Sequence, residues 1–167
     1  LKHALEVADV KGFARRKRES RKRGKVRGLG IGSFLEVTAP PSKEMGGIRF
    51  EADGTVTIIT GTLDYGQGHA APFAQVLTDK LGIPFERIRL LQGDSDELLA
   101  GGGTGGSKSI MHSGTAIVEA SAKVIDQGKQ IASHVLEAAV ADIEFAQGRF
   151  VIAGTDRAIG IMELAEK

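Results

Sequence analysis

The chain of 167 residues is long enough to form one large domain or two small ones around a buried core. It contains no cysteine, which excludes disulfides, thiolate metal sites and iron–sulfur ligation within the chain. The formal net charge is only +1, and neither a long apolar run nor a signal-peptide pattern occurs, so we expect no membrane span and a cytoplasmic location.

The two ends of the sequence predict a piece of a longer protein. The chain begins with Leu1 rather than methionine, and its last residues, GIMELAEK, are typical of the start of a helix. We expect residues 1–23 to form a basic helical lead-in and residues 24–167 to form the main subdomain.

A basic segment lies within this lead-in. Residues 15–25 contain eight basic side chains and one acid, Glu19. One interpretation is an exposed helix that packs through Leu5, Val10 and Phe13. The alternative is a nucleic-acid-binding module that uses this segment as its arm. The low aromatic content argues against a single-strand binder, because such proteins stack bases on aromatic rings.

Three alternate glycines follow in VRGLGIGSFLEVTAP, at Gly28, Gly30 and Gly32. A dinucleotide-binding loop would need a strand before these glycines and a helix after them. Here a charge cluster precedes them, and SFLEVTA, with its alternating β-branched residues, predicts a strand after them. The context therefore excludes a dinucleotide fingerprint.

The next stretch alternates strands and one helix. GGIRFEADGTVTIITG predicts a β-hairpin that turns at Asp53 and Gly54. Apolar residues at helical spacing then predict a helix over residues 70–81, ended by Gly82 and Pro84. RIRLLQG predicts a further strand.

The second half is dominated by helical periodicity. Apolar residues recur at three- and four-residue spacing from Ile117 to Val140, which predicts one long helix or two helices broken near Gly128. IEFAQGRFVIAG predicts a second hairpin that turns at Gln147 and Gly148. We therefore expect an α+β fold, with antiparallel β-hairpins packed against long helices.

Two glycine-rich loops, DYGQGH and GGGTGGSKS, each precede a predicted helix. The first turn of a helix has unpaired N–H groups and a partial positive charge, so it attracts anions. Glycine removes the side chains that would keep a ligand away. Thr104, Ser107 and Ser109 add hydroxyl groups, Lys108 adds a positive charge, and the Gln67 amide can donate and accept. Either loop alone could be a flexible connector, but two in one domain favour a binding site.

Other kinds of site find no support in the residues. The phosphate loop of nucleotide hydrolases requires a lysine where Ser107 stands. The four histidines show no metal-ligand spacing, and no nucleophile elbow with a catalytic triad is visible.

The stretch TGTLDYGQGHAAPFAQVLTDKLGIPFERIRLLQGDSDELLAGGGTGGSKS resembles the molybdenum-binding large subunit of the xanthine dehydrogenase, aldehyde oxidase and carbon monoxide dehydrogenase family. Its likeness is greatest to the bacterial carbon monoxide dehydrogenase branch. In that family, two such loops hold molybdopterin cytosine dinucleotide with its molybdenum. The resemblance implies that the cofactor-binding residues are Gly66, Gln67, Gly68, His69, Gly103, Thr104, Gly106, Ser107, Lys108 and Ser109.

The same resemblance implies the chemistry and the partners. Family members oxidise small molecules such as carbon monoxide, aldehydes or purines, and they pass electrons to [2Fe-2S] and FAD groups on a small and a medium subunit. The family's catalytic glutamate motif is not found in this chain, so we expect no catalytic residue here and no activity from the isolated piece. Two positions depart from the family pattern: Lys108 replaces an arginine, and Leu63 replaces a residue that is often polar.

Overall fold

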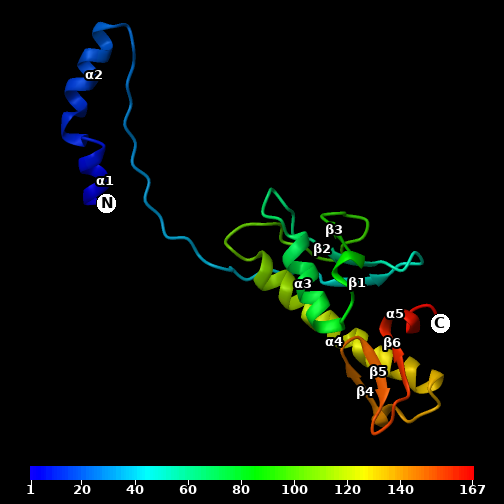
Figure 1. Ribbon diagram of the computed structural model, residues 1–167. Coiled ribbons are helices and arrows are strands. Elements are labelled where there is room, and N and C mark those ends of the chain that lie inside the picture. Colours follow the sequence, from blue (N-terminus) through cyan, green and yellow to red (C-terminus); the bar gives the residue numbers. More distant parts are fainter. The chain divides into compact units, whose positions relative to one another are not determined.

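The computed structural model describes residues Leu1 to Lys167, which form two units, Leu1–Glu36 and Val37–Lys167 (Figure 1). The first unit contains α1 (Lys2–Val7), the 3₁₀-helix η1 (Val10–Gly12) and α2 (Phe13–Lys22). Residues 24–36 contain neither helix nor strand.

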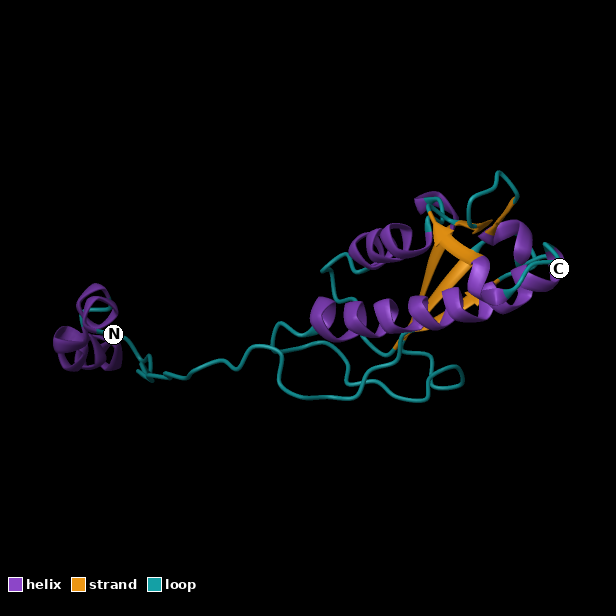
Figure 2. Cartoon of the chain, turned by 90° about the horizontal axis from the view of Figure 1, so that it is seen from below, coloured by secondary structure: helices purple, strands orange, loops and turns teal.

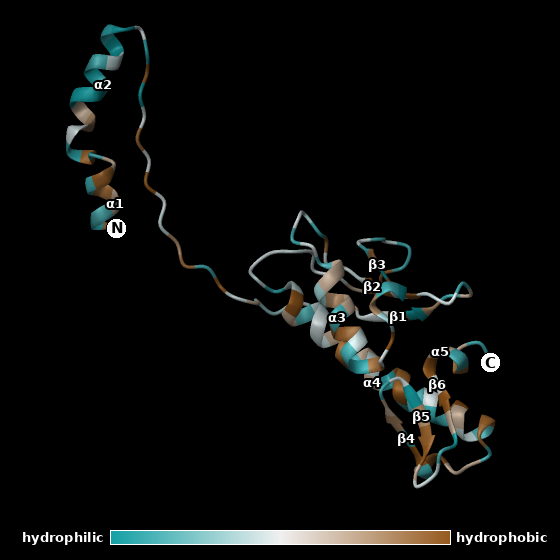
Figure 3. Cartoon of the chain, viewed as in Figure 1, coloured by the Kyte–Doolittle hydropathy of each residue, from teal (hydrophilic) through white to brown (hydrophobic).

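Within the first unit, a left-handed residue joins the short helices. Asp9 has a φ of 44°, and its carboxylate accepts a hydrogen bond from the Gly12 N–H at 3.1 Å. The Arg16 guanidinium bonds the same carboxylate and the carbonyls of Ala8 and Asp9. α2 carries most of the basic segment 15–25 and is coloured as hydrophilic over most of its length in Figure 3.

The expected strand at SFLEVTA is absent, and that prediction is wrong. Residues 33–39 adopt no strand, and neither sheet of the structure includes them. Alternating apolar residues make a strand only where a neighbouring strand pairs with their backbone groups, and this segment has no such neighbour in the chain.

The second unit begins with a three-stranded sheet. It contains β1 (Gly47–Phe50), β2 (Val56–Thr60) and β3 (Ile88–Gln92), in the order β1-β2-β3. β1 and β2 form the expected antiparallel hairpin, with Gly54 at a φ of 76° in its turn. β2 and β3 run parallel. The chain returns between them through α3 (Ala70–Leu81) and the 3₁₀-helix η2 (Phe85–Arg87).

α3 has the bounds that the sequence predicts. Its buried face carries Phe73, Leu77 and Leu81, which recur at helical spacing. Gly82 follows the helix with a φ of 65°, the left-handed conformation that commonly ends a helix.

α4 (Ser109–Val135) is one continuous helix, so the alternative of a break near Gly128 is wrong. Gly128 is buried, and a Cβ atom at this position would lie 2.2 Å from Cζ of Phe150. The glycine therefore permits close packing between the helix and β5 rather than interrupting the helix. Figure 2 shows α4 as the longest helix of the unit, alongside the strands.

A second three-stranded sheet follows α4 and the 3₁₀-helix η3 (Val140–Asp142). It is antiparallel throughout and contains β4 (Ile143–Ala146), β5 (Arg149–Ile152) and β6 (Ala158–Gly160), with α5 (Ile161–Leu164) after it. The expected turn between β4 and β5 is confirmed, since Gln147 and Gly148 both have positive φ values. The fold class is α+β, as predicted.

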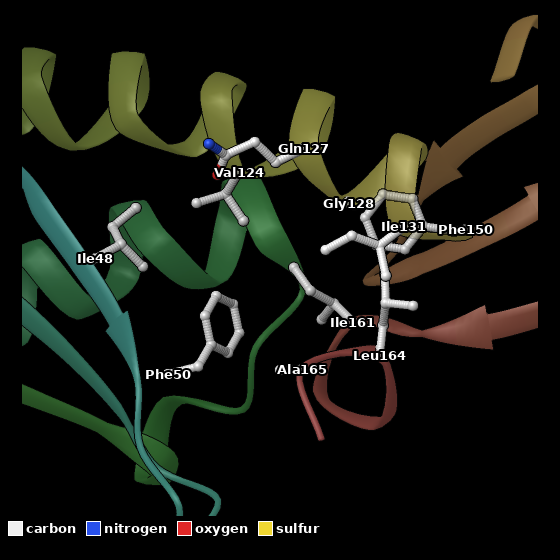
Figure 4. Close-up of a pocket in the computed structure, with 10 residues that line it drawn as sticks. All are labelled: Ile48, Phe50, Val124, Gln127, Gly128, Ile131, Phe150, Ile161, Leu164 and Ala165. Carbon is white, nitrogen blue, oxygen red and sulfur yellow. The ribbon is translucent and has the colours of Figure 1, made fainter. Parts of the chain in front are cut away.

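The core of the second unit lies between α4 and its neighbours. α4 contacts α3, β1, β4 and α5. Between β1, α4 and α5 the apolar side chains leave an open cavity of about 190 Å³ (Figure 4). The buried apolar residues include Val56, Ile58, Phe73, Leu77, Leu81, Ile83, Ile117, Ala132, Leu136, Ile143, Phe150, Ile159, Ile161 and Leu164.

Candidate functional site

Two glycine-rich loops leave the first sheet at the same edge. The first loop, residues 61–69, joins β2 to α3, and the second loop, residues 93–108, joins β3 to α4. Because β2 and β3 are parallel neighbours, their carboxyl ends lie side by side, and both loops can be followed from there in Figure 1. Ligands of open α/β sheets bind outside the carboxyl ends of parallel strands. The pairing thus assembles one candidate site from two distant segments.

The two loops touch each other through glycine and main-chain groups. A Cβ atom on Gly61 would lie 2.3 Å from Cα of Gly101, so neither loop tolerates a side chain at this contact. The Thr104 hydroxyl donates to the Leu63 carbonyl at 2.5 Å. The Leu63 side chain lies over Gly93, where an added Cβ would be 2.2 Å from its Cδ2. Leu63 therefore packs one loop onto the other.

The first loop is organised by Asp64, a residue that the sequence analysis missed. Its Oδ1 accepts hydrogen bonds from the N–H groups of Gly66 at 2.7 Å and Gly68 at 3.2 Å, and its Oδ2 accepts from His69 at 2.7 Å. The N–H groups of Gly66 and then His69 are the main causes that hold the pKa of this carboxyl below its ordinary value. Asp and Asn often bond the backbone of their own turn, so an aspartate at the start of a glycine-rich turn is the sequence feature that could have indicated this role.

Gln67 and His69 are placed differently from one another. Gln67 is exposed, and its Oε1 accepts from the Tyr65 N–H at 2.5 Å, so its amide N–H groups are left for a ligand. His69 is buried, and its ring stacks on Phe73 with 5.3 Å between centroids. The Gln92 amide nitrogen lies 3.2 Å from His69 Nδ1, which must accept because an amide nitrogen only donates.

The second loop ends in a helix without a side-chain cap. Lys108 is the N-cap residue of α4, and no side chain there bonds the free N–H groups of the first turn. The Lys108 ammonium donates to the Gly102 carbonyl at 2.9 Å. Ser107 has a φ of 52°, and the Ser109 hydroxyl lies 3.5 Å from that of Thr104. Hydroxyl, N–H and ammonium donors thus gather at this end of α4.

The two loops and the starts of both helices enclose an open hollow of about 470 Å³. Five of the ten expected site residues line it, and the other five belong to the same two loops. The lining residues that the sequence analysis missed are Pro72, Phe73, Gly105 and Ile110; they are apolar or without a side chain, so no chemical signal marked them. The five expected residues in the lining are Gln67, His69, Thr104, Ser107 and Ser109.

The segment that precedes β1 forms hydrogen bonds with both loops. The Glu44 carboxylate accepts from the Gly61 N–H at 2.8 Å and from the Thr62 hydroxyl at 3.1 Å. The Thr62 hydroxyl also bonds that of Ser113 on α4. The Ala39 N–H donates to the second loop, at the Gly106 carbonyl, over 2.6 Å. This hydrogen-bonded network was not predicted, because its members come from four separate segments.

The donors of the hollow fit an organic, anionic ligand. Nothing lies within 4 Å of the Cβ positions of Gly66, Gly68, Gly103 and Gly105, so a ligand can approach the backbone there. The side chains that surround the hollow supply hydroxyl and amide groups. Lys108 lies between the lining residues Ser107 and Ser109 in the chain, and its ammonium donates to the Gly102 carbonyl. No group of three or more His, Cys, Asp or Glu side chains is placed to hold a metal ion directly.

Comparison with known proteins decides the family. A family model described as the molybdopterin cofactor-binding domain matches residues 3–167. The chain belongs to this family. The resemblance drawn from the sequence is therefore confirmed.

Relatives of the domain are subunits of oxidoreductases. It is 31% identical over 162 residues to the 6-hydroxypseudooxynicotine dehydrogenase complex subunit gamma of Paenarthrobacter nicotinovorans, a match that covers 97% of this chain and 20% of that protein. It is 35% identical over 171 residues to the carbon monoxide dehydrogenase large chain of Afipia carboxidovorans, with 92% and 21% covered. The chain spans about a fifth of the length of these curated relatives.

A solved structure shows the same fold. The Cu,Mo-CO dehydrogenase in its carbon monoxide reduced state matches the domain with a TM-score of 0.71 and 31% identity. The match covers 98% of this chain and 23% of that one. None of these relatives supports the alternative of a nucleic-acid-binding module through residues 15–25. No helix of the domain has the length and apolar character needed to cross a membrane.

Proposed function

We propose that this domain forms part of the large subunit of a molybdenum hydroxylase and binds molybdopterin cytosine dinucleotide between its two glycine loops. The observation that supports the proposal most directly is the convergence of both loops, and of the first turns of α3 and α4, on one open hollow. A cofactor with a flat ring system and a phosphate-bearing tail needs both a bare backbone and anion-binding groups, and this hollow has both.

The two loops would contribute different contacts. Gln67 offers its free amide N–H groups from the first loop, where Gly66 and Gly68 leave the backbone open. Ser107 and the other hydroxyl and N–H groups at the start of α4 suit phosphate oxygens, and Lys108 supplies the balancing positive charge. Gly103, Thr104 and Gly106 complete the second loop, and Ser109 begins α4. His69 lines the hollow and packs on Phe73.

When bound, the cofactor supplies the redox chemistry that oxidises a small molecule such as carbon monoxide, an aldehyde or a purine. The residues of this domain hold the ligand and orient it, and we place no general base among them. The proposal includes the remainder of the large subunit, an FAD-binding medium subunit, a small subunit with [2Fe-2S] clusters and a cytoplasmic enzyme.

The test is the cofactor content of the full-length subunit that contains this domain. The subunit is purified from cells that make the cofactor, and its molybdenum and the CMP released by acid are measured per polypeptide. We expect both in equal amounts. A subunit that carries molybdenum but releases no CMP would contradict the dinucleotide form, and one that carries neither would contradict cofactor binding.

A further inference from the structure

Three main-chain N–H groups of the first glycine loop donate hydrogen bonds to a side chain of the same loop, Asp64. The two carboxylate oxygens of Asp64 accept from Gly66, Gly68 and His69 at 2.7 to 3.2 Å. We propose that Asp64 is the positioning residue of this site: its carboxylate shapes the first loop and directs the anionic group of the ligand to the second loop. This inference rests on the proposed function.

The geometry of the loop explains the first half of this role. Gly66 and Gly68 have φ values of 112° and 73°, conformations that L side chains rarely adopt. Successive N–H groups in such turns form a concave anion-binding nest. In this loop the anion is the Asp64 carboxylate, and both ends are anchored, by the Leu63 contact with Gly93 and by the buried ring of His69. The loop therefore holds its form before any ligand arrives.

The same contacts explain which ligand groups the first loop can take. The N–H groups of Gly66, Gly68 and His69 already donate to the Asp64 carboxylate. A second anion at this position would be repelled by the negative charge of Asp64 at close range. Gln67 keeps its amide N–H donors free, while its Oε1 already accepts one hydrogen bond, from the Tyr65 N–H. The first loop thus presents neutral hydrogen-bond donors, which suit the carbonyl or ring-nitrogen edge of a heterocycle.

The end of the second loop beside α4 is different in charge. Between residues 101 and 109 the only charged side chain is Lys108, and α4 begins without a side-chain cap. The acids of this loop, Asp94, Asp96 and Glu97, all lie at its other end, after β3, and Glu97 is paired with Arg49 at 2.9 Å. Asp94 bonds the N–H of Asp96 at the far end of the same loop. The contrast between the loops fixes the direction of an elongated ligand, with its phosphates at the second loop.

The inference can be tested on the 167-residue chain with inorganic pyrophosphate as the probe, using backbone amide NMR. In the unchanged protein, pyrophosphate should shift amide signals of residues 105–111 and leave those of Gly66, Gly68 and His69 in place. In Asp64→Ala these three amides should exchange with solvent roughly tenfold faster, because each loses a bond to a charged acceptor. They should also begin to respond to pyrophosphate, since their N–H groups are then free.

Two further variants separate shape from charge. Asp64→Asn keeps a side-chain oxygen that can accept hydrogen bonds, so the exchange of Gly66 should stay slower than in Asp64→Ala. Asp94→Ala is the matched control, because it removes a carboxylate from the other loop that bonds only its own turn. It should leave the amides of Gly66, Gly68 and His69 unchanged in both measurements.

The outcomes that overturn the inference differ from those that overturn the proposed function. A pyrophosphate response at Gly66 or Gly68 in the unchanged protein, or unchanged amide exchange in Asp64→Ala, removes the role of Asp64. Absence of any response at residues 105–111, with the exchange effect of Asp64→Ala present, overturns the direction of the ligand but keeps the role of Asp64 in shaping the loop. The proposed function fails separately, when the full-length subunit carries neither molybdenum nor CMP. A general loss of folding in Asp64→Ala would appear at every amide, and the Asp64→Asn variant then decides the role of the carboxylate.

Discussion

Gly61 and Gly101 meet back to back, so that a Cβ atom on Gly61 would lie 2.3 Å from Cα of Gly101 and 3.1 Å from the Ala100 carbonyl oxygen. The contact joins the end of β2 to the second glycine loop. Backbone atoms on both sides cannot move aside as a flexible side chain would. This pair of glycines therefore sets the separation of the two loops that line the hollow.

We predict that Gly61→Ala pushes the loops apart. Overpacking of this kind costs about 1–3 kcal/mol, so thermal melting should fall measurably, and cofactor content of the full-length subunit should fall with it. Gly160→Ala is the matched control, since nothing lies within 4 Å of its Cβ position, its φ is −72°, and it belongs to β6 rather than to either loop. Equal melting temperatures for Gly61→Ala and the unchanged protein would contradict the contact.

The side chains that face the ligand should affect binding rather than folding. Ser107→Ala should weaken cofactor affinity roughly ten- to a hundredfold, the usual effect of losing one hydrogen bond to a charged group. Gln67→Ala should weaken it by roughly two- to tenfold, because its amide faces a neutral part of the ligand. Both residues are exposed, so melting of the cofactor-free protein should change by no more than about 0.5 kcal/mol. The measurement is molybdenum and CMP content beside thermal melting. Full cofactor content in both variants would remove them from the site.

Two buried glycines of α4 should respond to alanine in opposite directions. Gly→Ala in a helix interior gains about 1 kcal/mol of helix propensity. At Gly114 the new Cβ would lie 3.4 Å from Cδ1 of Ile110, an ordinary contact, so Gly114→Ala should stabilise the domain. At Gly128 it would lie 2.2 Å from Cζ of Phe150, whose ring is fully buried. The overpacking cost of about 1–3 kcal/mol should exceed the gain there.

Urea unfolding measures this pair directly. Gly114→Ala should raise the urea midpoint and Gly128→Ala should lower it, with similar slopes for both if the unfolded states are alike. A rise for both variants would mean that Phe150 is free to move away from α4. In that case the fold would tolerate a larger distance between α4 and β5.

Acid should weaken the first loop through Asp64. The folded pKa of this carboxyl lies below its unfolded value of about 3.9, so its contribution to stability is fully present above the unfolded pKa. The contribution is lost as pH falls through the lower folded pKa. The urea midpoint of the unchanged protein should therefore fall more steeply than that of Asp64→Asn between roughly pH 5 and pH 2. Parallel curves for the two proteins would show that the carboxylate adds nothing to folding.

A second acid serves as the reference for this pH experiment. Glu51, which follows β1, has its pKa lowered by the Thr57 hydroxyl and then by Arg49, and neither partner belongs to the first loop. Glu51→Gln should flatten the acid limb of the urea curve in the same direction. It should leave the amide signals of Gly66 and Gly68 unchanged, whereas Asp64→Asn should move them.

Local patterns in the sequence determined the elements that depend on neighbouring residues. The helix at residues 70–81 follows from apolar spacing and from Gly82, which adopts the left-handed conformation that such a position requires. The hairpin turns at Gly54 and at Gln147 with Gly148 follow from turn chemistry in the same way. The glycine loops were also visible as segments, because their composition is local.

Only the tertiary structure decided what those segments meet. The parallel pairing of β2 with β3, the contact of Gly61 with Gly101 and the packing of Gly128 on Phe150 all join residues far apart in the chain. Periodicity cannot report such contacts, which is why Gly128 was considered a break in α4 and SFLEVTA was expected to be a strand. The role of Asp64 became visible only with the fold of its turn, because it depends on three N–H groups that converge in space.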